Sequence, residues 1–402
     1  MKKIFTLTLA LLASLPYLCA QDAAEEIQYR RSSIYSLMVK HEQQKFADTI
    51  AVVFKDMPVP DKYNDHDLSV KVVSVEEKKH VNPQEIEEFL NQNGVASRLV
   101  AKWFNRDFTN GVCDVELIKS RGVYNASEQD KALAQQMERG TALLEDAGLE
   151  LINNTFVIVN DIRYIDKGER SKLIGSIIRV AGAVAEAAGV SGMSDLADDL
   201  GDITESLKGF KVKIETHLYQ LVWDETTENN FYETLYTEQP DADRCALMGK
   251  SRGKFQLKYI GSQESDGSTT SFLGIKEDEP RLMVRKACQR ALDDNVANLQ
   301  KNFDVFKVKV PLLTVEPYTA QIGKKEGITE KSRFEVLEVR VKNGRTEYKR
   351  VAELRPTKSN QIWDNRFMAV EEKAEGATLG YTTFKKISGG DIYPGMLIRE
   401  IK

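Results

Sequence analysis

The chain changes its pattern near residue 315, and this change divides it into two parts with different folds. From residue 318 onward, short runs alternate between polar and apolar residues, as β-strands do. Two runs, Arg333–Val341 and Thr346–Leu354, flank Asn343-Gly344, a dipeptide that favours a tight hairpin turn because both central positions need positive φ. We therefore predict that residues 316–402 form a small all-β barrel domain of SH3-like or OB-like kind. Further strands are punctuated by Gly380, Gly389, Gly390 and Gly395.

Residues 21–315 mix helical and strand patterns and predict an α+β domain with a mixed sheet. Thr155–Ile165 and Lys211–Trp223 are rich in β-branched and aromatic residues, so we expect them to be neighbouring strands of that sheet. The stretch Gly261–Ser271 is polar and without periodicity, which predicts a loop. The other expected strands are 32–40, 69–75, 254–260 and 305–313, and the expected helices are 43–57, 83–94, 99–104, 127–147, 231–236 and 280–302.

Residues 168–210 are predicted to be an inserted helical hairpin. Its first helix, Leu173–Val190, is apolar except for Arg179 and Glu186, two charges that disfavour a membrane span. The second helix either covers the first so that both lie on the sheet, or leaves its small residues to contact another subunit, a partner or the membrane surface. The candidate contact residues are Ile174, Ile177, Ala181, Gly182, Val184 and Gly189.

A second candidate contact site is the polar and aromatic run Trp363-Asp364-Asn365-Arg366. Such a run suits either ligand recognition or the closure of a barrel corner, and the surrounding strand pattern favours the corner. Trp363 and Arg366 are therefore included in the candidate interaction surface.

The first twenty residues have the layout of an export signal. Lys2 and Lys3 precede an apolar run, and the expected cleavage lies between Ala20 and Gln21. A lipoprotein signal would place a small residue before its cysteine, whereas Leu18 precedes Cys19, so we expect no lipid anchor. The predicted location is the periplasm or the outer membrane surface of a Gram-negative cell.

Composition is that of an ordinary globular protein, with 42% hydrophobic and 29% charged residues. The formal net charge is −5 and the chain has no long basic tract, so nucleic acid is not expected as a partner. After removal of the signal, Cys113, Cys245 and Cys288 remain, which permits at most one internal disulfide and leaves the pairing open. The favoured interpretation is that they are small buried apolar residues.

No pattern of residues indicates catalysis or a cofactor. The chain lacks a CxxC motif, and Gly323–Gly327 leads into a strand, which is not the context of a phosphate loop. The segment Asp61–Asp67 places three carboxylates and His66 close together, but it has neither the spacing nor the glycine of a calcium loop. A solvated turn is the favoured interpretation, and we expect neither a metal nor a cofactor.

Several segments together resemble uncharacterised exported proteins of Bacteroidetes bacteria. The resemblance covers most of the chain and implies a compartment without implying an activity or functional residues. A fainter similarity, in element order alone, is to envelope proteins of curli secretion and flagellar assembly. The segments are KKIF at the start, Ala20-Gln21, SSIYSLMVKH, PVPDKYNDHD, NNTFVIVNDIRYID, THLYQLVW and IGKKEGI.

These observations lead us to expect an exported, non-enzymatic binding or assembly factor of the cell envelope. Its partners would be envelope proteins of unknown identity, with peripheral membrane contact and oligomerisation left open. The first alternative is a subunit of an envelope pore or secretion assembly. The second is a hydrolase whose catalytic residues are scattered along the chain.

Overall fold

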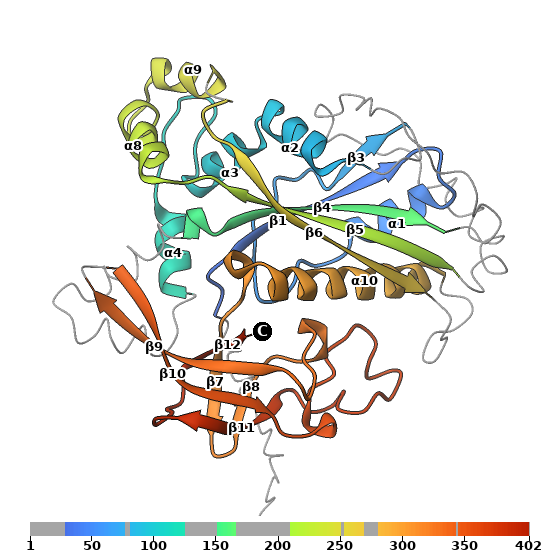
Figure 1. Ribbon diagram of the computed structural model, residues 1–402. Coiled ribbons are helices and arrows are strands. Elements are labelled where there is room, and N and C mark those ends of the chain that lie inside the picture. Colours follow the sequence, from blue (N-terminus) through green and yellow to red (C-terminus); the bar gives the residue numbers. More distant parts are fainter. Residues whose placement is uncertain are drawn as a thin grey trace, which may run out of the picture.

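The computed structural model describes residues 29–76, 81–124, 151–165, 210–250, 253–268, 280–342 and 345–401. They form two lobes, an upper one built on a mixed sheet and a lower one built of antiparallel strands (Figure 1). The α+β class is therefore confirmed. In the upper lobe the strands are β1 (Ser33–His41), β2 (Asn64–Asp65), β3 (Val72–Val75), β4 (Thr155–Tyr164), β5 (Lys211–Leu221) and β6 (Leu257–Ser268).

The sheet of the upper lobe has the order β2-β1-β4-β5-β6, and β3 also pairs with β1. Strands β2, β3 and β4 run parallel to β1, whereas β4, β5 and β6 alternate in direction. The register of β4 and β5 runs from Phe156 opposite Gln220 to Tyr164 opposite Val212. The two strands predicted to be neighbours are thus paired over nearly their whole length.

Helices cover both faces of this sheet. One face carries α2 (Pro83–Gln92), α3 (Val95–Trp103) and α8 (Glu225–Thr234), whose aromatic residues fill a large core with the sheet. The opposite face carries α1 (Ala47–Lys55) and α10 (Pro280–Asn302), which pack on a second core. Helices α4 (Glu116–Tyr124) and α9 (Ala242–Lys250) complete the helices described in this lobe.

Local sequence explains where two of these helices begin. Asn82 caps α2 by accepting a hydrogen bond from the backbone N–H of Gln84, and Pro83 occupies the first helical position, where its missing N–H costs nothing. Helix α1 begins at Ala47 and not at the predicted Gln43, because Phe46 adopts φ 63° and interrupts the helical backbone there.

Strand β6 corrects the prediction of a loop from Gly261, since it continues to Ser268. Its polar side chains face solvent and pair across the strands, as Lys213 does with Glu264. Its small residues face α10, where a side chain at Gly267 would collide with the carbonyl oxygen of Ala287. The strand is therefore stabilised by its pairing with β5 and its packing on α10. Neither contact requires alternating hydrophobic residues, so the sequence of this stretch does not show a strand pattern.

The lower lobe is a six-stranded antiparallel sheet with the order β10-β11-β8-β7-β12-β9, and β9 pairs in turn with β10. The predicted hairpin is present, because Lys342 at the end of β9 lies opposite Arg345 at the start of β10. The strands are β7 (Val310–Val315), β8 (Tyr318–Ala320), β9 (Arg333–Lys342), β10 (Arg345–Pro356), β11 (Thr382–Gly389) and β12 (Leu397–Ile401), with short 3-10 turns η1 (Asp304–Phe306), η2 (Lys324–Glu326) and η3 (Ser359–Gln361).

The chain enters the lower sheet earlier than the predicted domain boundary after Val315. Strand β7 already pairs with β12 and β8, so the lower sheet begins at Val310. The strand predicted at 305–313 is instead the turn η1 followed by β7. Alternation of polar and apolar residues did not locate the start of the strand correctly. Phe306 belongs to the 3-10 turn η1, but it is buried and so fits the alternating pattern of a strand.

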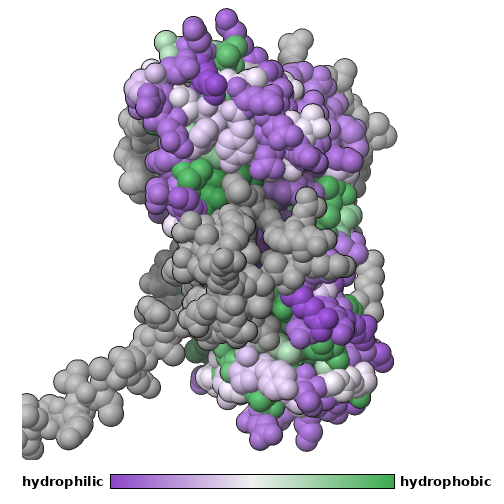
Figure 2. All heavy atoms as spheres, turned by 90° about the vertical axis from the view of Figure 1, so that its left-hand side faces the viewer, coloured by the Kyte–Doolittle hydropathy of each residue, from purple (hydrophilic) through white to green (hydrophobic). Residues whose placement is uncertain are grey.

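Several predicted features lie outside the described residues. They are the export signal with its Ala20–Gln21 cleavage site, the helix at 127–147, and the hairpin at 168–210 with its candidate contact residues. In the part of the chain that the structure describes, no helix has the length and apolar character needed to cross a bilayer. Figure 2 shows that hydrophilic residues cover most of the described surface visible on one side of both lobes.

Candidate functional site along helix α10

Helix α10 lies between the upper sheet and the lower lobe, so it is enclosed on two sides (Figure 1). Its sheet side carries small apolar residues, with Val284, Ala287 and Ala291 fully buried. Its other side carries a stripe of polar residues at helical spacing, and the lower lobe covers part of that stripe. The buried polar residues of α10 are Lys286, Gln289, Asp293, Asn295 and Gln300.

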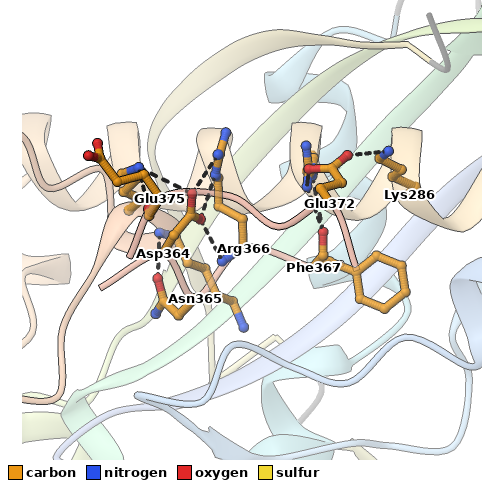
Figure 3. Close-up of polar contacts among 10 residues, drawn as sticks. Lys286, Asp364, Asn365, Arg366, Phe367, Glu372 and Glu375 are labelled. Carbon is orange, nitrogen blue, oxygen red and sulfur yellow. Dashed lines mark hydrogen bonds and ion pairs between the residues drawn. The ribbon is translucent and has the colours of Figure 1, made fainter. Parts of the chain in front are cut away.

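The first contact between α10 and the lower lobe is a carboxylate held by two cations. Glu372 forms ion pairs with Lys286 and, at 2.6 Å, with Arg290, and Arg290 also donates to the carbonyl oxygen of Phe367 at 2.8 Å (Figure 3). Burial alone would raise the pKa of Glu372, but its hydrogen bonds to these two cations outweigh burial and hold the pKa below its usual range. We call these three charged residues the seam.

Next to the seam, the predicted corner residues bind one another and the turn η2. Asp364 accepts hydrogen bonds from Arg366 at 2.7 and 2.9 Å and from Lys324 at 3.2 Å, as Figure 3 shows. Burial opposes ionisation of Asp364, yet the bonds from Arg366 and Lys324 lower its pKa overall. The amide oxygen of Asn365 accepts from the backbone N–H of Lys325 at 2.8 Å.

These contacts place both candidate residues of the corner. Arg366 is half-buried, and its guanidinium forms an ion pair with Asp364. Trp363 is also half-buried, and its backbone is hydrogen-bonded to Thr382 and Lys324. Closure of a corner and ligand recognition remain the two interpretations of this run, and the internal bonds favour closure.

A pocket opens beside α10 on the side of the upper lobe. It lies between α10, the middle of β1 and β4, and the segment Met57–Pro60 that follows α1. Its volume is about 40 Å³, which is room for a compact group of a few atoms, since one water needs about 10–15 Å³. The walls are mainly apolar and include Phe54, Met57, Pro58, Val59, Pro60, Ile158, Leu292 and Val296.

Two acceptor oxygens in this pocket have no hydrogen-bond partner among the described residues. Gln289 and Asp293 lie one helical turn apart, and Nε2 of Gln289 donates to Oδ1 of Asp293 at 3.0 Å. This bond leaves Oε1 of Gln289 and Oδ2 of Asp293 without a partner, although the two residues are only 7% and 5% exposed. Buried polar atoms in native proteins are nearly always paired, so this arrangement is the strongest indication of a binding function in the described chain.

The electrostatics of Asp293 set it apart from the acids of the seam. Burial raises the pKa of Asp293 to about 7, and the nearby ammonium of Lys325 only partly opposes this shift. Lys325 is itself bound to Asp61 at 3.2 Å, so its charge is shared. Burial lowers the pKa of Lys325, but Asp293, Asp61 and Glu326 outweigh burial and raise it overall.

Acids outnumber bases in the lining of the pocket. Asp65 and Asp67 line it together with Asp293, and one lysine, Lys71, lines it as well, its ammonium donating to the carbonyl oxygen of Lys55. Ser36 also lines the pocket, where its Oγ accepts from Asn160 at 3.3 Å and keeps a further lone pair. The lining therefore offers mostly hydrogen-bond acceptors and more acidic than basic side chains.

The predicted solvated turn at Asp61–Asp67 is wrong for its histidine. His66 is fully buried, stacks on Trp103, donates from Nε2 to the carbonyl oxygen of Leu99 and accepts at Nδ1 from Arg121. Burial lowers the pKa of His66 to about 3, so the ring is neutral. Asp67 does cap a turn, by accepting from the backbone N–H of Ser69. Within the described ranges, no three His, Cys, Asp or Glu side chains gather closely enough to hold a metal ion.

A buried ion pair at the end of β1 was not predicted. Nε2 of His41 lies 2.7 Å from Oδ1 of Asp161, and Oδ2 of Asp161 accepts from the backbone N–H of Val81. Burial would raise the pKa of Asp161, but the bond to His41 lowers it overall. The pair joins β1, β4 and the segment that enters α2, which is a structural role. In the sequence, His41 and Asp161 are isolated polar residues, and no pattern indicates that they pair.

A larger hollow of about 450 Å³ lies between α2 and the sheet. It is lined by apolar residues such as Val39, Val75 and Phe89, with Glu85 and Glu88 beside them. Among the described residues, its lining contains no buried side chain that lacks a hydrogen-bond partner. It therefore offers space without a defined recognition chemistry.

Cys113, Cys245 and Cys288 are free thiols, and Cys113 and Cys288 are buried. Burial raises the pKa of the Cys288 thiol to about 12, so it is protonated at neutral pH. Cys245 is half-buried, and its Sγ donates to the carbonyl oxygen of Phe108.

Sequence reasoning missed both pocket residues. The signal that would have found them is the stripe Lys286, Gln289, Asp293 and Gln300, which places polar residues on one side of a helix that has apolar residues on its other side. Such a stripe is usually solvated, and only the folded structure shows that it is covered, by the lower lobe at Lys286 and by β1, β4 and Met57–Pro60 at Gln289 and Asp293.

No protein-family model matches the chain, and no curated protein matches it.

Proposed function

We propose that the protein is an exported, non-enzymatic binding or assembly factor of the cell envelope, with the pocket beside α10 as its ligand site. The observation that supports this proposal is the pair of buried acceptors without partners, Oδ2 of Asp293 and Oε1 of Gln289. Export to the periplasm or the outer membrane surface, without a lipid anchor, rests on the N-terminal signal.

The scaffold around the pocket suits binding. Both acceptors stand on a helix that is packed against the sheet on one side and joined to the lower lobe on the other, by the seam and by Lys301, which donates to the carbonyl oxygen of Gly327 at 2.6 Å. Groups on a helix that is fixed on two sides lose little conformational entropy when a ligand binds.

For the lower lobe we propose the finer description of a small SH3-like or OB-like barrel that contacts partners. The strand order, which returns to its first member, supports a barrel. Small barrels of this kind commonly present one face or their loops to a partner. The second proposed contact surface is the inserted segment 168–210, whose small residues permit close approach of another helix.

Deletion of the insertion tests the partner hypothesis. Tyr164 lies opposite Val212 in the β4–β5 register, so a short turn can replace residues 172–208 without disturbing either strand. We expect this variant to fold with an unchanged unfolding midpoint. In intact cells, chemical cross-linking followed by purification and mass spectrometry should recover fewer envelope proteins with the variant than with the full chain. Equal recovery from both chains, or loss of folding, would contradict a partner role for the insertion.

Oligomeric state separates this proposal from a subunit of a pore or secretion assembly. Size-exclusion chromatography with light scattering of the mature chain is expected to give a monomer or a small oligomer. A large ring-like oligomer would favour the pore alternative.

A hydrolase is the second candidate function, favoured by the same carboxyl group. A buried acid with a pKa near 7 can donate or accept a proton at neutral pH, as a general acid or base must. Turnover of a panel of ester, peptide and glycoside substrates that is lost in Asp293→Asn and kept in Asp294→Asn would support the hydrolase. No turnover by the wild-type chain is the result that the binding proposal predicts.

A further inference from the structure

We propose that the pocket beside α10 binds a primary alkylammonium group, which would donate hydrogen bonds to Asp293 and Gln289. This inference rests on the proposed function and specifies its ligand. It depends on which polar atoms are left for a ligand, on the charges around them and on the space available.

The polar atoms call for a ligand that donates hydrogen bonds. The amide Nε2 of Gln289 is already used on Oδ1 of Asp293, so the free atoms of the two side chains are both acceptors. Ser36, which receives a bond from Asn160, adds a third oxygen with a free lone pair. A primary ammonium carries three N–H donors and no acceptor, so it matches three acceptors without leaving an unpaired polar atom.

The charges favour a cation over a neutral donor. Three acidic residues line the pocket, Asp65, Asp67 and Asp293, against the single lysine Lys71. Beyond the lining, Lys325 from the turn η2 faces Asp293, but this lysine is bound to Asp61. An ammonium placed at Oδ2 would compensate the carboxylate that the fold itself leaves without a cation at hydrogen-bond distance.

The space favours a slender ligand. A volume of about 40 Å³ admits an ammonium head and a short part of its alkyl chain. The walls around the acceptors are apolar, formed by Met57, Leu292 and Val296 among others, and suit methylene groups. The flat, five-donor guanidinium of an arginine is broader and less compact than this head group. The group has two sources, a free small amine or the side chain of a lysine on a partner.

Calorimetric titration of the full mature chain with n-propylammonium chloride at about pH 8 tests the inference. Tetramethylammonium chloride is the matched cation, because it has the charge but no N–H donor. We expect saturable binding of propylammonium and none of tetramethylammonium. Asp293→Asn should weaken propylammonium binding about ten-fold or more, the cost of losing one charged hydrogen bond. The adjacent Asp294 does not line the pocket, so Asp294→Asn should leave binding of propylammonium unchanged.

A second variant and a second ligand complete the test. Gln289→Leu removes the other acceptor without changing the charge and should also weaken binding of propylammonium. An acetylated peptide with one lysine, compared with the same peptide carrying norleucine, distinguishes a partner's side chain from a free amine. Equal heats with both ammonium salts, or unchanged binding in Asp293→Asn and Gln289→Leu, would overturn the inference.

The two proposals fail separately. If propylammonium does not bind but the cross-linked envelope partners are still recovered, the ammonium pocket is wrong and the binding factor stands. If propylammonium binds and no partner is recovered, the assembly role is wrong and the pocket stands.

Discussion

The seam and the pocket share helix α10, and each contains one acid that is largely shielded from water. Glu372 in the seam meets two cations, Lys286 and Arg290, and its pKa is lowered. Among the described residues, Asp293 in the pocket meets only the neutral amide of Gln289 at hydrogen-bond distance, and its pKa is raised to about 7. The side chain of Glu372 is 12% exposed and Asp293 is 5% exposed. Burial raises the pKa of both carboxyl groups, and the two cations of the seam reverse the direction for Glu372.

The difference shows that the partners of a buried acid decide its protonation and, with it, its role. A carboxylate that is matched by cations from another element fastens two parts of the protein together. A carboxyl group whose second oxygen has no partner keeps its capacity to bind. We therefore interpret the seam as a structural contact between the lobes. We interpret the pocket as a site for a ligand whose hydrogen-bond donors the described residues do not supply.

The largest effect on stability is expected from Glu372→Gln, which removes the carboxylate that pairs with the two cations of the seam. Lys286 is 3% exposed, and its buried ammonium would lose the ionised carboxylate that it contacts. Removing one partner of a buried ion pair typically costs about 3–5 kcal/mol, so we expect the free energy of unfolding to fall by roughly that amount. Urea unfolding at neutral pH measures the change.

The neighbouring Glu371→Gln is the matched control for this variant. Glu371 is exposed, and surface substitutions usually change stability by less than about 0.5 kcal/mol. If the two variants unfold at the same urea concentration, the seam does not hold the lobes together in the way described.

The opposite effect is expected in the pocket from Asp293→Asn. The folded pKa is raised to about 7 from an ordinary 3.8, so the unfolded chain releases this proton at lower pH than the folded chain does. The contribution of Asp293 to stability is therefore largest below about pH 4 and falls as the pH rises towards 7, by up to about 4 kcal/mol. Asparagine has no charge to bury, so the variant should be more stable than the wild type by roughly 2–4 kcal/mol at pH 8.

The pH dependence is the distinctive readout of this second variant. The advantage of Asp293→Asn should shrink between pH 7 and pH 4 and vanish below that range. Asp294→Asn, at the adjacent exposed position, should give a much smaller gain of the same sign, because the pKa of Asp294 is raised only by partial desolvation. A wild-type chain as stable as Asp293→Asn at pH 8 would show that Asp293 has a partner that stabilises its charge.

The elements that sequence predicted best are those whose stability is local. Helix α10 begins at Pro280 and ends at Asn302 as expected. Proline suits the first turn of a helix, and apolar residues recur at helical spacing over a long stretch after it. Strands β4 and β5 and the β9–β10 hairpin were likewise expected from β-branched residues and from the Asn-Gly dipeptide. In each case the residues that cause the structure are neighbours in the chain.

The features that sequence missed depend on residues far apart. The outer half of β6 is polar and is a strand because β5 and α10 lie beside it. Gln289 and Asp293 look like members of a solvated stripe, and they form a pocket only because β1, β4 and Met57–Pro60 enclose them. The seam was missed for the same reason, since Glu372 lies in a segment with no pattern of its own. No local signal carries such information.

The smallest effect is expected from an ion pair that water reaches, and it sharpens the comparison. Lys213 and Glu264 lie 2.8 Å apart across β5 and β6, as close as the partners in the seam, but their side chains are 38% and 48% exposed. A double-mutant cycle with Lys213→Met and Glu264→Gln should give a coupling below about 1 kcal/mol, and the coupling should decrease with added salt. The same cycle on Arg290 and Glu372, 2.6 Å apart and less exposed, should give a larger coupling that salt hardly changes. If both couplings were equal, distance alone would set the strength of these pairs, and burial would no longer support the proposal that the unmatched acid Asp293 is a binding site whereas an unmatched acid on the surface is not.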